Sequence, residues 1–348
     1  MFFGDDNMRY IGGKSLLLDN ILKTISNNTS NVKTVLDIFA GSGAVSTYLK
    51  KNNYHIFSND ILYFSYVLQY ASVVINEKPT FSKLNILNPI SYLNSITISN
   101  TDFSKDMCFM YNNYSLYNSD RMYFQEKNAL KIDLIRLTIE KWRREKLISK
   151  NEYFYLLASL INAVPYISNI AGVYAAYLKF WDKRTYNNLE LKEVEINNNN
   201  QFAHQCFNED YTKLLDMQCD ILYADPPYNG REYLPNYHIL ETIARYDYPE
   251  IYGITGMREY SHAKSPFCKK RLVESAFEKL IKETKCRYIL ISYNNEGIIS
   301  TSKLSELCQS YAVDNSFKLF EFPYRRYKNK IPNNTVGLKE QLYLLKKF

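Results

Sequence analysis

Clusters of cysteine or histidine are missing from this sequence. The six cysteines are scattered through 348 residues without a C-x-x-C pair, and the four histidines are equally dispersed. Structural zinc sites need thiolate or imidazole ligands at short, regular spacings. The sequence therefore predicts no metal site, and it indicates free thiols buried in a reducing compartment.

Long apolar runs are missing as well. No stretch approaches the roughly 18 apolar residues that span a bilayer, and the first residues, MFFGDDNMRYIGGK, lack the basic-then-apolar pattern of a secretory signal. We therefore expect a soluble protein of the cytoplasm. The net charge of +7 suits a polyanionic partner such as nucleic acid, but a solvated basic surface on an enzyme with a neutral substrate would give the same charge.

The pattern of apolar runs predicts an α/β fold. Residues 32–60, VKTVLDIFAGSGAVSTYLKKNNYHIFSND, contain a strand, a glycine turn, a helix and a second strand, an order typical of parallel sheets. Further strands are expected in DILYADPPY and CRYILISYNN, and the tail predicts a β-hairpin. Residues 129–146 and 151–164 have helical periodicity instead. We expect one α/β domain, residues 1–94 and 201–348, interrupted by a mostly helical insert at 95–200.

The glycine turn DIFAGSG, Asp37 to Gly43, lets a ligand approach the backbone closely where the first strand ends. A dinucleotide fingerprint would need a further glycine where Ser46 stands, and the GGKS segment at 12–15 has Met8 in place of the first glycine of a phosphate loop. These departures disfavour a pyrophosphate ligand and ATP. A nucleoside-type ligand remains, and Asp60 at the end of the second strand would accept hydrogen bonds from its ribose hydroxyls, unless Asp60 is only a turn residue.

The motif DPPY, Asp225 to Tyr228, predicts a rigid corner at the end of another strand of the same sheet. Ligands of open α/β sheets bind at the carboxyl ends of the strands, so the corner and the glycine turn should face one crevice. A carboxylate and an adjacent carbonyl, fixed by Pro226 and Pro227, can accept both hydrogens of an exocyclic amine and aim its lone pair at an electrophile. Tyr228 offers a face for base stacking. The alternative is an ordinary strand-end turn with Tyr228 in the core.

DPPY, together with DIFAGSG, YIGGK and Asp210 in CFNEDY, resembles the DNA adenine-N6 methyltransferases of the Dam-like, alpha arrangement. In that arrangement the glycine motif comes first, a recognition insert second and DPPY last, and the resemblance covers nearly the whole chain. It implies a Rossmann-like catalytic domain at 1–94 and 201–348 that uses S-adenosylmethionine, and a target-recognition region at 95–200. It also implies methylation of a flipped-out adenine in a short duplex DNA site, within a prokaryotic or phage restriction–modification system. A cognate restriction endonuclease or a companion methyltransferase is then a candidate partner.

The resemblance also assigns roles to individual residues. Tyr10, where many relatives have Trp, and Lys14 would contact the cofactor or hold its pocket. The methionine part of the cofactor would be bound by Asp37, Phe39, Gly41 and Gly43. Asp60 would bind its ribose, and Asp210 would bind the amine of its adenine. Glu209 is adjacent to Asp210, and either acid could point inward. The catalytic group would be Asp225, Pro226, Pro227 and Tyr228, with Asp225 also beside the cofactor.

Extruding an adenine from the duplex costs a few kcal/mol, which DNA contacts must offset. The candidate phosphate-binding residues are Lys179, Lys183, Arg184, Arg231, Arg325, Arg326, Lys328 and Lys330. Each of these charges alone is more often only a solvated surface residue. Two other functions stay open: transfer to cytosine N4 or to the amino group of an RNA base, although N4 enzymes more often have Ser at the position of Asp225, and a catalytically silent DNA-binding relative.

Overall fold

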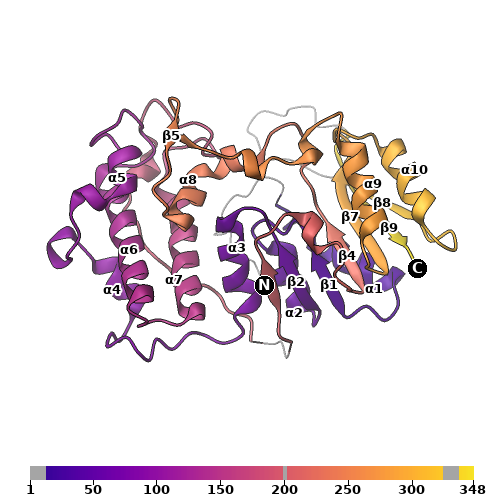
Figure 1. Cartoon of the computed structure of the whole chain (residues 1–348), viewed down its shortest axis with the longest axis horizontal. Helices are drawn as coiled ribbons and strands as arrows, with labels where there is room; N and C mark the ends of the chain where they lie inside the picture. The colour runs from indigo at the N-terminus through magenta and orange to yellow at the C-terminus, as the bar shows by residue number, and fades with distance from the viewer. Residues whose placement is uncertain (1–12, 199–201, 324–336) are drawn as a thin grey trace. The chain divides into compact units, whose positions relative to one another are not determined.

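A computed structural model provides the structure of this chain, and its residues 13–198, 202–323 and 337–348 are described here. These residues form two compact units (Figure 1). The sheet unit comprises residues 14–61, 202–232, 262–323 and 337–348, and the helical unit comprises residues 13, 62–198 and 233–261. Each unit is therefore assembled from segments that lie far apart in the sequence.

In the described part of the sheet unit, seven strands form one sheet. The strand order across it is β3 (Gln205–Phe207), β2 (His55–Asn59), β1 (Thr34–Asp37), β4 (Ile221–Ala224), β7 (Tyr288–Asn294), β9 (Lys339–Lys346) and β8 (Lys318–Pro323). Strands β3, β2, β1, β4 and β7 are parallel to their neighbours in this order, whereas β9 is antiparallel to both β7 and β8. The expected α/β sheet that ends in an antiparallel hairpin is confirmed.

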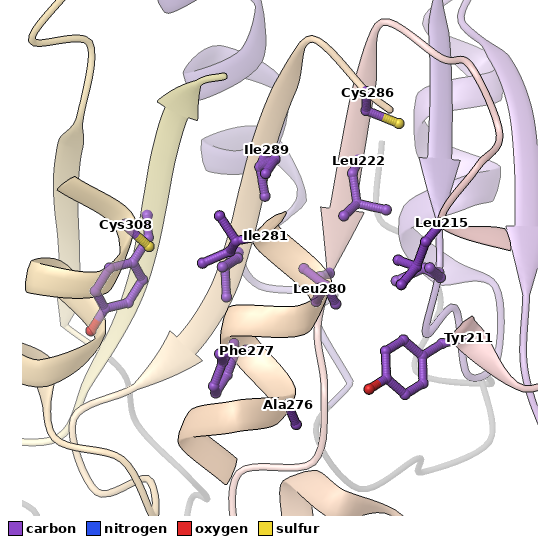
Figure 2. Close-up of a cluster of buried hydrophobic side chains, with 14 of the residues drawn as sticks. Tyr211, Leu215, Leu222, Ala276, Phe277, Leu280, Ile281, Cys286, Ile289 and Cys308 are labelled. Atoms are coloured by element: carbon purple, nitrogen blue, oxygen red, sulfur yellow. The ribbon is translucent and has the colours of Figure 1, made fainter. Parts of the chain in front are cut away.

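Helices cover this sheet because their apolar residues recur at helical spacing. In α9 (Val273–Glu283), Phe277, Leu280 and Ile281 are fully buried. They belong to one core cluster with Leu222 of β4 and Ile289 of β7, and Figure 2 shows this packing. The other helices of the unit are α1 (Leu18–Asn28), α2 (Ala44–Lys51) and α10 (Thr301–Tyr311), with the 3₁₀ turns η6 (Tyr211–Leu214) and η8 (Pro266–Cys268).

The helical unit contains the two long helices that the sequence predicts. They are α6 (Glu126–Arg144) and α7 (Lys150–Ala163), which pack against each other (Figure 1). Its other helices are α3 (Tyr63–Gln69), continued by the π-helical η1 (Tyr70–Val74), then α4 (Pro89–Ser95), α5 (Phe109–Asn113) and α8 (Tyr233–Arg245). Short 3₁₀ turns are η2 (Ile98–Asn100), η3 (Lys105–Met107), η4 (Val164–Ile167) and η5 (Lys183–Tyr186), while β5 (Ile251–Tyr252) pairs with β6 (Met257–Arg258). A last turn, η7 (Ser261–Ala263), follows where the chain passes to the sheet unit.

The bounds of the helical unit differ from the expected insert at 95–200. The unit begins at residue 62 and also takes in residues 233–261. The reason is the packing of α3 against α8, where the buried carboxylate of Glu241 accepts hydrogen bonds from the N–H groups of Tyr63 (3.1 Å) and Phe64 (2.9 Å). This caps the start of α3 and fixes it to a helix about 175 residues later, a pairing that periodicity alone does not reveal.

No helix in the described ranges is long and apolar enough to cross a membrane.

Candidate functional site

The carboxyl ends of three neighbouring parallel strands bring the predicted acids to one edge of the sheet. In register, Asp37 of β1 lies beside Ser58 of β2 on one side and Tyr223 of β4 on the other. Asp60 and Asp225 each follow two residues after these partners. Since parallel strands end at the same edge, the three carboxylates gather there, as the sequence predicts.

The glycine turn between β1 and α2 has a backbone conformation that favours glycine. Gly41 and Gly43 have φ angles of 54° and 80°. The Gly43 N–H donates to the Ala40 carbonyl (2.8 Å), the Ala40 N–H donates to the Asn59 carbonyl (2.9 Å), and the Gly41 N–H donates to Oδ2 of Asp60 (2.9 Å). The turn is therefore tied to the end of β2.

Asp37 is fully buried, with one carboxylate oxygen that no described group satisfies. Ser46 donates to its Oδ2 over 2.6 Å, whereas Oδ1 has no hydrogen-bond partner in the described part of the chain. Burial raises the pKa of Asp37 to about 7, against the lowering effect of the Ser46 hydrogen bond, and the charges of Asp225 and Asp60 raise it further. A buried acceptor of this kind costs free energy unless a ligand donates to it.

At the DPPY corner, Asp225 is held by a buried lysine. The ammonium of Lys14, which is 5% exposed, lies 3.2 Å from Oδ1 of Asp225 and 3.0 Å from Oε2 of Glu340. Burial alone would lower the pKa of Lys14, but the two carboxylates raise it above its ordinary value. The pKa of Asp225 is raised to about 6 by burial, lowered by Lys14 and raised again by Glu340.

The aromatic residues within the two motifs, Phe39 and Tyr228, are half-buried. Phe39 packs against the rings of Tyr211 and Phe267, with centroid distances of 5.4 and 5.3 Å. Tyr228 also packs against the core of the sheet unit, and its carbonyl accepts a hydrogen bond from the N–H of Ile298 (3.1 Å). The backbone of the corner is anchored before the prolines by the pairing of Ala224 with Ile291 and after them by the hydrogen bond at Tyr228, and Pro226 itself is buried.

Asp210 and Glu209 both lie at the end of β3 and are engaged locally. Asp210 is exposed and caps η6 by accepting from the N–H of Thr212 (2.9 Å). Glu209 forms an ion pair with Lys213 (2.6 Å), and its carbonyl accepts from Asn59 Nδ2 (3.0 Å). One carboxylate oxygen of Asp210 is therefore committed to the helix cap.

The predicted DNA-contacting residues have different surroundings. Lys179 and Lys183 of the helical unit are exposed, as is Arg231 of the sheet unit. Arg184 is half-buried, pairs with Asp182 at 3.3 Å and donates to the Ile170 carbonyl at 3.1 Å. Part of its donor capacity is thus used inside the helical unit. The remaining site predictions lie outside the described residues: Tyr10, Arg325, Arg326, Lys328 and Lys330.

Two residues that contact the acids at the sheet edge were not predicted as site residues from the sequence. Ser46 was noted there only as a departure from a glycine fingerprint, although its hydroxyl donates a hydrogen bond to Asp37. Glu340 is at the start of β9, and because β9 is antiparallel its first residues lie at the carboxyl edge of the parallel strands. A single acid before the apolar run QLYLL was the available signal. Among the described side chains, no group of three or more His, Cys, Asp or Glu could hold a metal ion.

Comparison with known proteins agrees with these motifs. The family model of the D12 class N6 adenine-specific DNA methyltransferases matches residues 10–307. The type II methyltransferase M.FokI of Planomicrobium okeanokoites is 45% identical over 98% of this chain and 53% of its own length, and the modification methylase StsI of Streptococcus sanguinis is 39% identical over 98% and 52%. The chain spans about half the length of these two relatives. The type II methyltransferase M.NlaIII of Neisseria lactamica is 34% identical over 98% of this chain and 99% of its own length. The chain belongs to the D12 class N6 adenine-specific DNA methyltransferase family.

Proposed function

We propose that this chain transfers a methyl group from S-adenosylmethionine to N6 of an adenine in a short duplex DNA site, as the modification component of a type II restriction–modification system. The observation that carries the proposal is the rigid DPPY corner, with Asp225 at the same sheet edge as the glycine turn. Family membership and the type II relatives support the same substrate.

The residues at the sheet edge fit S-adenosylmethionine. Oδ1 of Asp37, which no described residue satisfies, and the nearby charges of Asp60 and Asp225 favour a ligand with cationic and donor groups. S-adenosylmethionine carries a sulfonium and an ammonium. When bound, it would supply an electrophilic methyl group. The residues that would hold it are Tyr10, Lys14, Asp37, Phe39, Gly41, Gly43, Asp60 and Asp210.

The corner residues act on the target amine. Asp225 and the Pro226 carbonyl accept its two hydrogens and turn its lone pair toward the methyl group, while Tyr228 holds the base flat. The prolines fix the direction of the carbonyl before the base arrives, so no reorganisation is needed during the reaction. With its pKa at about 6, Asp225 is ionised near neutral pH and can accept a hydrogen bond.

The DNA itself would be held by exposed basic side chains. Lys179, Lys183 and Arg231 are exposed, and each can neutralise a phosphate. We assign target recognition to the mostly helical region at 95–200, of which the helical unit contains residues 95–198. M.FokI, StsI and M.NlaIII come from bacteria, so we place the protein in the cytoplasm of a prokaryotic or phage-infected cell, beside a cognate restriction endonuclease or companion methyltransferase.

Expression in cells whose DNA lacks methylated adenine tests the proposal. Sequencing that detects modified bases should find N6-methyladenine at one short site, and cells that express the Asp225→Ala variant should show none. Unmodified DNA, or modification of cytosine alone, from cells that contain the folded wild-type protein would contradict the proposal.

A further inference from the structure

Lys14 is shared between two carboxylates that come from different strands. Asp225 follows β4, and Glu340 is the second residue of β9, where it lies opposite Asn294 of β7. The two acids approach the same ammonium, at 3.2 and 3.0 Å, and both Lys14 and Glu340 are buried. The antiparallel hairpin therefore contributes a charged residue to the edge where the parallel strands end.

The charges of this trio do not cancel. Two carboxylates and one ammonium leave a net charge of −1, whereas Lys14 and Asp225 alone would be neutral. Among the described residues, the titratable groups that face the trio are Asp37, also acidic, and the hydroxyl of Tyr223. Burial raises the pKa of Tyr223 well above its ordinary value, so this hydroxyl stays neutral. Glu340 thus supplies the charge that keeps the trio itself anionic.

Excess negative charge matters for methylation of an amine. A nitrogen that gains a methyl group carries positive charge until it loses a proton, and preorganised negative charge in a water-poor site stabilises that transition state. Lys14 contacts Oδ1 of Asp225, and in the described part of the chain no group donates to Oδ2 of this carboxylate. A neutral Asp225–Lys14 pair would offer the amine an acceptor without net charge.

We propose that Glu340 is a positioning residue for adenine methylation: it anchors Lys14 on Oδ1 of Asp225 and keeps the trio anionic, so that Oδ2 faces the target amine as a charged acceptor. The inference rests on the proposed function and extends it to a residue outside both sequence motifs. Glu340 acts through Lys14 and Asp225 and does not touch the base.

The test compares Glu340→Gln with a matched Glu→Gln change in an exposed ion pair. Gln keeps the shape and an acceptor oxygen for Lys14 but removes the charge. The control is Glu274→Gln on α9, where Glu274 pairs with Lys303 at 3.1 Å and both side chains are about half exposed. We expect the single-turnover methylation rate of Glu340→Gln to fall on the order of 10- to 100-fold, with S-adenosylmethionine and DNA affinities within about threefold of wild type. Glu274→Gln should match wild type.

The pH profile separates this role from a general loss of structure. Glu340 raises the pKa of Asp225 and Lys14 lowers it. The acid limb of the rate profile should therefore move to lower pH in Glu340→Gln and to higher pH in Lys14→Met. The Lys14→Met/Glu340→Gln double variant returns the net charge to −1, so its rate should exceed that of Lys14→Met.

The outcomes distinguish the two proposals. An inactive wild-type protein that binds S-adenosylmethionine contradicts the proposed function. An active wild type with Glu340→Gln equal to Glu274→Gln in rate and pH profile overturns the role of Glu340. If Glu340→Gln does not fold, as judged by its denaturation midpoint, the double variant decides, since it removes the charges of both Lys14 and Glu340 and keeps the net charge of the wild-type trio. A rate no higher than that of Lys14→Met then overturns the inference.

Discussion

The N–H of Gly41 donates to Oδ2 of Asp60 over 2.9 Å, which joins the glycine turn to the end of the neighbouring strand. The backbone of Asp60 is fixed too, because Asn208 Nδ2 donates to its carbonyl at 2.8 Å. The carboxylate is consequently held at the turn before any ligand binds. Such preorganisation reduces the entropy cost of accepting hydrogen bonds from a ribose.

Asp60→Ala should weaken S-adenosylmethionine binding by about 10- to 100-fold, because hydrogen bonds to a charged group contribute about 1.5–3 kcal/mol. Titration calorimetry of the purified protein measures this change. The control is Asp216→Ala, which removes an exposed carboxylate of the same sheet unit. Equal affinities of the two variants would show that Asp60 only stabilises the turn.

Asp225→Ala should lower the single-turnover methylation rate by about 100-fold or more, since it removes a preorganised acceptor at the reacting amine. The fold should tolerate the change, because Lys14 keeps its ion pair with Glu340 at 3.0 Å. Binding to the target duplex, measured by fluorescence anisotropy at one fixed salt concentration, should stay within about threefold of wild type. A variant that methylates adenine at the normal rate would refute the role of the corner.

The sequence predicts the parts of the fold that depend on local periodicity. The βαβ unit at 32–60 and the helices α6 and α7 follow from apolar spacing, and the rule for parallel strands then places Asp37, Asp60 and Asp225 at one edge.

Features that depend on distant pairing could not be predicted in this way. Glu340 reaches the edge only because β9 is antiparallel to β7, and α8 joins α3 through Glu241 across a long stretch of sequence. Neighbouring acids with similar side chains are equally hard to separate. Asp210 and Glu209 become distinct only through their partners, the N–H of Thr212 and the ammonium of Lys213.

Binding of S-adenosylmethionine should tighten as the pH rises from about 5 to about 8. The pKa values of Asp37 and Asp225 are about 7 and about 6, and a cationic ligand beside them favours the ionised forms, so binding releases protons. Ser46→Ala removes a hydrogen bond that lowers the pKa of Asp37 and should move the rise to higher pH. Calorimetry in buffers of different ionisation enthalpy counts the released protons. An affinity that falls with pH would contradict the assignment, and S-adenosylhomocysteine, which lacks the sulfonium charge, should show a weaker dependence.

Asp133 of α6 should control the stability of the helical unit. It is fully buried and accepts from the N–H groups of Met110 (2.9 Å) and Tyr111 (2.8 Å) and from the hydroxyl of Tyr246 (2.7 Å). Asp133→Ala leaves three donors unsatisfied, so the free energy of unfolding should fall by about 2–5 kcal/mol in urea titrations. The exposed Asp120→Ala should match wild type.

The contribution of Asp133 to stability should depend on pH. Burial raises the pKa of Asp133 to about 7, although its three donors lower it, so the folded state binds this proton more tightly than the unfolded chain does. The contribution to stability therefore declines as the pH rises from about 4 to about 7. The deficit of Asp133→Ala should therefore be larger near pH 5 than near pH 8, and a deficit that grows with pH would refute this account.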